Sequence, residues 1–421
     1  MSDRTLALIL VFCCVFLTTT AGASLTAERT SLDPADVKIA PRSSFQEVSI
    51  AGCLSIGDVG APALPVEVLH FVIPHDADVS DVVLTDLNEI EMPGTYRVAP
   101  AQPDVPTGSE LVWADPDPSI YESDAPYPES RIRYLGAGYL AGYRIASVAV
   151  YPLQYSPRLG KLTLASSYRV ELDVRPAADT SHGRDRLTSS SEATYRRLVS
   201  GLVANPEDVD RSRPQAHAAD VYTGGFSPRY TPSLEGSPVE YVIVTGDQFE
   251  SQFQAFADWK TGLGVPAVVR TTSWINSSYP GGVDTAERIR MFIKDAYESW
   301  GCTYVLLAGD TDVVPARYAK SLYSGGEMIP ADIYYSCLDG NWNGDGDSYF
   351  GEGFGGIGAP GDSVDLYPDV FVGRAPVNTP VEVETFITKS QSYVQGPSLD
   401  FTGRNLLLAE VLFPYDWEGG T

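Results

Sequence analysis

Oxygen-bearing side chains alternate with glycines over residues 339–347, which have the sequence Asp-Gly-Asn-Trp-Asn-Gly-Asp-Gly-Asp. Ca²⁺ prefers oxygen ligands, and glycines let a short loop wrap around such an ion. One register follows the spacing of calcium-binding loops except that asparagine replaces aspartate at its first position. That register comprises Asn341, Asn343, Asp345, Gly346 and Glu352. The same residue types also build ordinary solvated turns, so a plain loop is the competing interpretation.

The ligands predicted in this loop are Asp339, Asn341, Asn343, Asp345, Asp347 and Glu352. A second set of carboxylates surrounds it in the sequence. Asp310 directly follows an apolar run, and Asp362, Asp365 and Asp369 precede another. Carboxylates as dense as these repel one another unless a cation neutralises them. The sequence therefore predicts bound calcium in this part of the chain.

Nucleophilic catalysis has few candidate residues in this sequence. All four histidines precede residue 218, whereas a Cys–His or Ser–His–Asp site needs an imidazole beside its nucleophile. Cys302 adjoins a predicted buried strand and Cys337 adjoins the acidic segment, where the pKa of a thiol is raised. We expect both cysteines to be structural and assign no catalytic residue in this chain. A metal-dependent hydrolase is weakly supported, because the motifs His-Glu-x-x-His and Cys-x-x-Cys are absent.

Strands and helices alternate from residue 240 onward. Predicted strands cover residues 241–245, 266–270, 304–308, 370–372 and 406–409. Helices are predicted to follow Asp247, Asp284 and Thr379. The helix after Asp284 gathers its apolar residues on one face, namely Ile289, Phe292, Ile293, Ala296, Tyr297 and Trp300. Such alternation predicts a mainly parallel sheet with helices on both faces, and places Asp310 at the edge where such sheets hold ligands.

The first part of the chain has a different pattern. Residues 24–175 contain apolar residues at every second position between turn clusters, as in residues 161–174, and this predicts a β-sandwich. Residues 176–229 are polar and rich in proline and arginine, with one short helix predicted around 192–204. This segment is predicted to be a linker.

Composition and the N-terminus indicate the compartment. The 421 residues carry a formal net charge of −26, which argues against a nucleic-acid or anionic-membrane partner. Arg4, an apolar run over residues 6–17 and the small residues 21–23 predict a signal peptide over residues 1–23, cleaved after Ala23. We therefore expect a secreted or cell-surface protein without a membrane span in its mature form.

Several segments, in this order and spacing, resemble the gingipain-type cysteine peptidases. They are residues 229–232, 240–245, 257–260, 289–297, 303–310 and 369–374. Residues 60–65 and 151–155 resemble the propeptide domain of the same family. The resemblance implies an α/β caspase-like fold, a mainly parallel sheet with flanking helices, preceded by an all-β sandwich prodomain. The α/β peptidase domain is then expected to start at residue 230 and to be incomplete at residue 421.

The resemblance also implies processing and metal sites. Cleavage is expected between Arg229 and Tyr230, which would begin the mature enzyme. A structural calcium ion is expected at Asp310, Asp365, Asp369 and the backbone carbonyl of Tyr367, with Asp362 as a weaker match. The catalytic His and Cys of the family are expected beyond residue 421, so this chain by itself is expected to be inactive.

Two functions from different classes follow from these observations. The first is a secreted gingipain-like cysteine endopeptidase precursor that acts on protein or peptide substrates and whose own prodomain is an intramolecular inhibitor. The second is a noncatalytic, calcium-stabilised secreted module for adhesion or assembly, which would fit the absence of histidine after residue 217.

Overall fold

The computed structural model describes residues 24–29, 32–55, 57–103, 112–177, 189–212, 239–320, 328–352, 362, 364 and 366–396. Some predictions fall outside these residues: the signal peptide with Ala23, the processing site at Arg229 and Tyr230, the ligand Asp365 and the strand over 406–409. Among the described helices, none combines the length and apolar character needed to cross a membrane.

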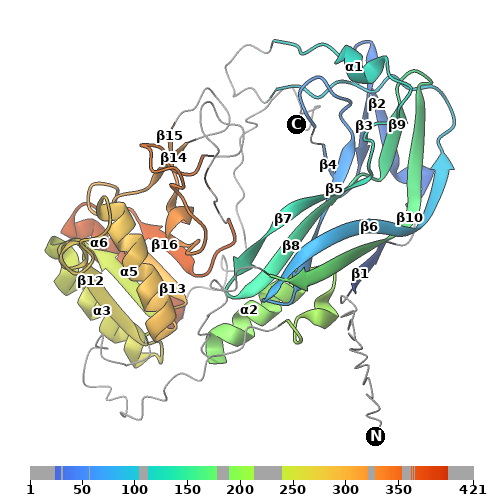
Figure 1. Ribbon diagram of the computed structural model, residues 1–421. Coiled ribbons are helices and arrows are strands. Elements are labelled where there is room, and N and C mark those ends of the chain that lie inside the picture. The colour runs from blue at the N-terminus through green and yellow to red at the C-terminus, as the bar shows by residue number, and fades with distance from the viewer. Residues whose placement is uncertain are drawn as a thin grey trace, which may run out of the picture.

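Two antiparallel sheets form the N-terminal region (Figure 1). The first consists of β1 (Ser24–Arg29), β10 (Lys161–Pro176), β6 (Ala77–Glu91) and β9 (Leu153–Ser156), with β10 paired to the other three. The second has the order β4 (Leu54–Ser55), β5 (Pro65–Ile73), β8 (Tyr143–Val150), β7 (Ile132–Leu140). A hairpin of β2 (Val37–Arg42) and β3 (Phe45–Ile50) and the short helix α1 (Pro118–Tyr121) complete the region.

The core between these sheets follows from the period of two in their strands. Val170 and Leu172 on β10 face Phe71 on β5 and Val148 on β8, in one buried cluster. Successive side chains of a strand point to opposite faces, so alternating apolar residues give each sheet one apolar face. Two such faces bury each other, which produces the predicted β-sandwich.

The second region contains a parallel sheet with the strand order β12 (Ala267–Thr271), β11 (Tyr241–Thr245), β13 (Tyr304–Ala308), β16 (Phe371–Ala375). Every pairing in this sheet is parallel. Helix α5 (Thr285–Trp300) packs on one face, whereas α3 (Glu250–Gly262) and α6 (Pro380–Gln395) pack on the other. All six apolar residues predicted for the α5 face are buried. The fold class, a mainly parallel sheet with flanking helices after a β-sandwich, is confirmed.

Five smaller elements complete the description of this region. They are α4 (Thr272–Ser278), the strands β14 (Tyr318–Lys320) and β15 (Met328–Pro330), and the 3₁₀ helices η3 (Asp247–Phe249) and η4 (Asp332–Tyr335). Helix η4 and the loop after it pack against the α5 side of the sheet through Tyr334, Tyr335 and Trp342.

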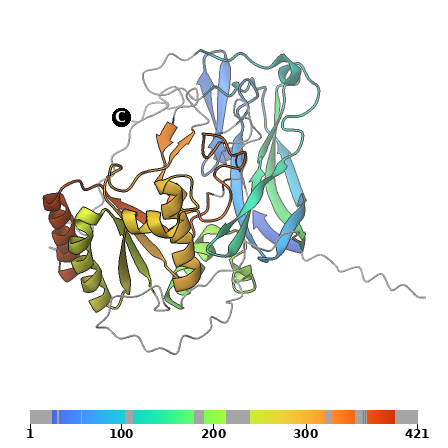
Figure 2. The same ribbon diagram turned by 60° about the vertical axis from the view of Figure 1, so that its left-hand side comes forward.

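Helix α2 (Ser189–Leu202) connects the two regions. It continues into the short helix η2 (Pro206–Asp208), and the buried Asn205 between them bonds both backbone groups of Val72 on β5, at 3.0 and 2.9 Å. An asparagine side chain with this geometry pairs like one residue of a neighbouring strand. Figure 2 shows α2, in green, where the sandwich meets the α/β region.

Candidate metal centre and interdomain contact

Three acidic side chains of the predicted calcium loop lie together. The carboxylate oxygens of Asp345, Asp347 and Glu352 are within 4.8 Å of one another. Gly346, the glycine of the predicted register, has φ 76°, a left-handed conformation that favours glycine. The loop therefore brings together three of the six ligands predicted for it.

The backbone of this loop is shaped by its own polar side chains. Asn341 accepts a hydrogen bond from the amide of Asn343 at 3.0 Å, and Asn343 donates its Nδ2 to the carbonyl of Asp347 at 3.0 Å. Asp345 accepts from the amide of Asp347 at 3.2 Å. The Oδ1 atom of Asn343 is shielded from water and has no hydrogen-bond partner. A buried oxygen in this state is available to a cation.

Asp362, the weaker match among the predicted calcium ligands, accepts hydrogen bonds from three backbone amides near the loop. Its Oδ1 accepts from the amide of Gly344 at 2.5 Å, and its Oδ2 accepts from the amides of Gly351 and Glu352 at 2.8 and 3.2 Å. The residue is 5% exposed. Its carboxylate thus links residue 344 to residues 351 and 352 and holds the two ends of this segment together.

A cation from the protein itself also reaches the loop. The Nζ atom of Lys320, on β14, lies 3.3 Å from Oε1 of Glu352 and 3.6 Å from the ring centroid of Tyr349. This ammonium group neutralises part of the acidic charge. The contact between Lys320 and Glu352 could not be predicted from the sequence, because no local motif signals a contact between residues 32 positions apart.

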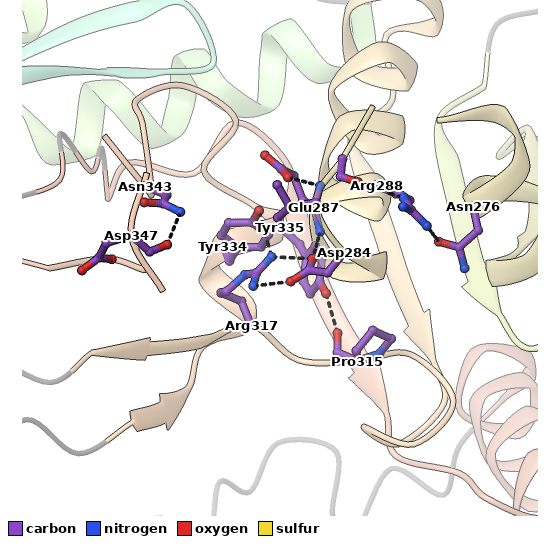
Figure 3. Close-up of polar contacts among 12 residues, drawn as sticks. Asn276, Asp284, Glu287, Arg288, Pro315, Arg317, Tyr334, Tyr335, Asn343 and Asp347 are labelled. Atoms are coloured by element: carbon purple, nitrogen blue, oxygen red, sulfur yellow. Dashed lines mark hydrogen bonds and ion pairs between the residues drawn. The ribbon is translucent and has the colours of Figure 1, made fainter. Parts of the chain in front are cut away.

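A network of polar contacts centred on Arg317 lies next to the end of the loop (Figure 3). Its guanidinium group donates two hydrogen bonds of 2.8 Å to the carboxylate of Asp284 and lies 3.8 Å from the ring centroid of Phe350 and 4.6 Å from that of Tyr334. Asp284 also begins helix α5 by accepting from the amide of Glu287 at 2.8 Å. Arg317 therefore ties the start of α5 to the end of the acidic loop.

Asp310 and Asp369 do not form one site. Register pairs Tyr304 with Phe371 and Ala308 with Ala375, so Asp310 follows β13 at its carboxyl end whereas Asp369 precedes β16 at its amino end. Along the strands, the Tyr304–Phe371 pair and the Ala308–Ala375 pair are already about 13 Å apart, and Asp310 and Asp369 lie beyond these pairs in opposite directions. The prediction that Asp310 shares a calcium ion with Asp369 and Tyr367 is wrong, because parallel strands bring like ends together. The side chain of Asp310 instead accepts from Asn378 at 3.1 Å.

Asp339 lies outside the three-carboxylate cluster as well. Its backbone carbonyl accepts a hydrogen bond of 2.9 Å from Nη2 of Arg290, which also bonds the carbonyl of Cys337 at 2.8 Å. Arg290 thereby fixes the chain just before the loop begins.

Tyr367 and Asp369 contact the N-terminal region. The hydroxyl group of Tyr367 lies 2.7 Å from Oγ of Ser147 and 3.3 Å from Nδ1 of His70, both on the second sheet of the sandwich. Asp369 accepts a hydrogen bond from the amide of Ala141 at 3.3 Å. These contacts join segments more than 200 positions apart, and the sequence carried no signal for them.

Cys302 and Cys337 lack the environment of a nucleophile. Cys302 is 1% exposed, and burial raises the pKa of its thiol to about 12. Cys337 is fully buried and, like Cys302, is not in a disulfide. A thiol needs access and a lowered pKa to attack a carbonyl group. Their placement agrees with the structural role predicted for both.

A pocket of about 350 Å³ lies between η4 and β16. Its lining is mostly apolar and consists of Asp332, Ile333, Ser336, Pro368, Val370, Phe371 and Val372. Asp332 forms an ion pair of 2.6 Å with Arg374 of β16. No histidine or cysteine lines this pocket.

Comparison with known families divides the chain into two consecutive matches. Residues 19–195 match the family model Propeptide_C25, and residues 235–418 match peptidase family C25. The chain is 22% identical over 389 residues to Lys-gingipain W83 and over 381 residues to another Lys-gingipain, both from Porphyromonas gingivalis. These alignments cover 89% and 87% of this chain but 19% of each relative. The chain thus spans about a fifth of the length of these curated relatives.

Solved structures give weaker likenesses of the same kind. A complex of the pro- and mature domains of RgpB from Porphyromonas gingivalis matches with a TM-score of 0.36 and 16% identity, over 44% of this chain and 93% of that one. Dimeric latent PorU from the same organism matches with a TM-score of 0.29 and 16% identity, over 88% of this chain and 37% of that one. Since two models of one family match consecutive parts that together make up most of the sequence, the chain belongs to peptidase family C25, the gingipain-type cysteine peptidases.

Proposed function

We propose that the protein carrying this chain is a secreted gingipain-like cysteine endopeptidase made as an inactive precursor. The observation that supports this most strongly is the order of the two family matches, propeptide before peptidase. The second candidate, a noncatalytic adhesion or assembly module, is not favoured by these matches.

In this proposal a cysteine thiolate attacks the peptide carbonyl, and a histidine first accepts and then donates the proton. These two residues are assigned to the complete protein and to none of the described residues. The buried Cys302 and Cys337 are unsuitable as nucleophiles because burial withholds them from substrate.

The N-terminal region is proposed to be the intramolecular inhibitor. Its contact with the α/β region, through α2 and the β7–β8 turn, supports this role. Processing between Arg229 and Tyr230 would separate the two parts of the chain. N-terminal sequencing of the mature protein tests that junction, and a mature N-terminus at another residue would contradict it.

Hydrolysis of a protein substrate by the complete protein tests the main proposal. We expect cleavage that a thiol reductant supports and iodoacetamide abolishes, and no cleavage by the 421-residue chain alone. The control variant replaces both Cys302 and Cys337 by serine in the complete protein, and it should keep iodoacetamide-sensitive activity. Cleavage that persists after complete alkylation would rule out a cysteine peptidase.

We also propose that the acidic loop holds a structural calcium ion. Asp345, Asp347 and Glu352 would supply carboxylate oxygens, and the buried Oδ1 of Asn343 an amide oxygen. This donor set suits a hard cation. Lys320 is a cation at the margin of the same cluster, so it would lower the affinity for calcium. Bound calcium would stiffen the loop and the segment before it.

A further inference from the structure

Asp369 lies where three elements from different parts of the chain meet. It is 1% exposed, and each of its carboxylate oxygens accepts a backbone amide: Oδ1 that of Ala141 at 3.3 Å, and Oδ2 that of Leu338 at 2.7 Å. Its backbone carbonyl accepts from the hydroxyl group of Tyr195 at 2.6 Å. A buried carboxylate is tolerated where donors satisfy its lone pairs.

The two amides belong to different regions. Ala141 and Gly142 form the turn between β7 and β8 of the sandwich, with φ of 45° and 81°. Positive φ at both positions is the geometry of a tight hairpin turn. Leu338 belongs to the α/β region and directly precedes the acidic loop. One carboxylate thus joins the tip of a prodomain hairpin to the entry of the proposed calcium loop.

Helix α2 supports this contact with an aromatic pair. The ring of Tyr195 stacks on that of Phe371 with 5.4 Å between centroids and 7° between planes. Phe371 begins β16, two residues after Asp369. The same buried cluster contains Tyr143 and Val199 from the N-terminal side. Figures 1 and 2 show α2 below the end of β7 and β8, where this cluster lies.

The entry of the loop depends on the same residue through its backbone. The amide of Asp369 donates to the carbonyl of Ser336 at 2.8 Å, while its carboxylate accepts from Leu338. Residues 336–338 are therefore fixed at both ends by Asp369, at Ser336 by its backbone amide and at Leu338 by its carboxylate. Movement of Asp369 must shift this short segment.

We infer that Asp369 is a positioning residue through which the β7–β8 turn and helix α2 of the N-terminal region hold residues 336–338 of the α/β region in place. Loss of the N-terminal region would remove two of its partners, Ala141 and Tyr195, and loosen the entry of the acidic loop. The inference goes beyond the proposed peptidase function and does not depend on it, because it concerns contacts inside the 421-residue chain.

Amide hydrogen exchange of the whole chain tests this inference, with Leu338 as the reporter. Tyr195→Phe removes only the hydroxyl donor to Asp369, and Tyr195→Ala also removes the ring stack. We expect exchange at Leu338 to rise about threefold in the first variant and about tenfold in the second. The matched control is Arg196→Ala, at the next position of α2. Its exposed ion pair with Asp210 lies outside the contact, so exchange at Leu338 should not change.

A third variant probes the carboxylate itself. Asp369→Asn keeps the shape but places an NH₂ group where an oxygen stood, and both positions face amide donors. One of the two amides, Ala141 or Leu338, must then lose its acceptor, and its exchange should rise about tenfold.

Exchange at Ile243, in the centre of the parallel sheet, reports global unfolding. If Tyr195→Ala raises exchange at Ile243 too, that variant has destabilised the whole fold. The inference is then tested by exchange at Leu338 in Tyr195→Phe alone. The inference is overturned if Leu338 exchanges at the original rate in Tyr195→Phe with the sheet intact. Since hydrolysis is not measured, this result is independent of whether the complete protein is a peptidase.

Discussion

Carboxylates that look alike in the sequence have three different environments in the fold. Asp345 and Asp347 face each other in an exposed cluster, Asp362 accepts three backbone amides, and Asp369 bridges two regions. Only the first pair retains the charge density that calls for a cation. A carboxylate saturated by amides has found its compensating partners within the protein.

Thiol labelling tests the assignment of the cysteines. In the folded chain, we expect iodoacetamide at pH 8 to modify the half-buried Cys53 and to leave Cys302 and Cys337 unmodified. With a pKa of about 12, Cys302 has a thiolate fraction on the order of 10⁻⁴ at that pH. Peptide mass spectrometry before and after unfolding in urea is the measurement. Labelling of Cys302 in the folded chain would contradict its burial.

The Arg317–Asp284 pair predicts a pH-dependent contribution to stability. Burial alone would raise the pKa of Asp284, but hydrogen bonds from Arg317 and from the amide of Glu287 lower it below its usual value. A lowered pKa means that the carboxylate stabilises the fold above the unfolded-state pKa, and that this contribution is lost as pH falls through the folded-state pKa.

Asp284→Asn should therefore reduce the free energy of unfolding at pH 7 by about 1 kcal/mol, a modest value because the half-exposed carboxylate is screened by water. Asparagine still caps the helix, so the difference isolates the ion pair. Urea unfolding at several pH values is the measurement. The difference between variant and original should be constant from pH 7 to about pH 5 and shrink below about pH 4. An undiminished difference at pH 3 would show that the ion pair is not its cause.

At the scale of elements, the backbone at the C-terminus of helix α5 adopts a left-handed conformation that favours glycine, and Gly301 occupies this position. Gly301 has φ 72° and caps the helix by donating to the carbonyls of Ala296 and Tyr297. Gly301→Ala should lower the free energy of unfolding by about 1 kcal/mol, because an L side chain is strained in this conformation.

Gly262, the last residue of α3, has open space around its Cα position. Gly262→Ala is the control and should stabilise the fold by up to about 1 kcal/mol. Thermal unfolding measures both; equal effects would contradict the cap.

The acidic loop gives a second prediction at this scale. Calcium at about 100 times its Kd should raise the free energy of unfolding by about 2.7 kcal/mol relative to chelator. The double variant Asp345→Asn, Asp347→Asn should lose this difference, whereas Asp310→Asn should keep it, because Asp310 lies elsewhere. Calorimetry with and without chelator is the measurement, and identical melting of the original chain in both would contradict a calcium site.

The whole molecule carries a net charge of −26, and this charge opposes a compact state through self-repulsion. With chelator present, raising the salt concentration from about 10 to 150 mM shortens the Debye length from about 30 to 8 Å. We expect the melting temperature to rise. Choline chloride at equal ionic strength should act like sodium chloride, because screening is not specific to the ion. A fall in melting temperature would mean that attractive ion pairs dominate over the net repulsion.

Much of the fold could be predicted from residue patterns. The α5 face from Ile289 to Trp300 was predicted because apolar residues recur at helical spacing, and all of it is buried. The strand at Tyr304–Ala308 was predicted because an apolar run between polar residues fits a strand covered on both sides. These patterns are local consequences of backbone geometry, so they can be recognised in the sequence without knowledge of the tertiary structure.

The candidate site was predicted less completely, for a physical reason that separates the two sources of information. The fold class, the spacing of ligands within the loop and the absence of histidine after residue 217 can be read from the amino-acid sequence, because these features depend on neighbours along the chain. The folded molecule was needed to show that Asp310 and Asp369 lie at opposite ends of their strands, that Lys320 approaches Glu352, and that Asp369 bonds the β7–β8 turn. Strand order and packing set those distances, and neither is encoded in the spacing of a motif.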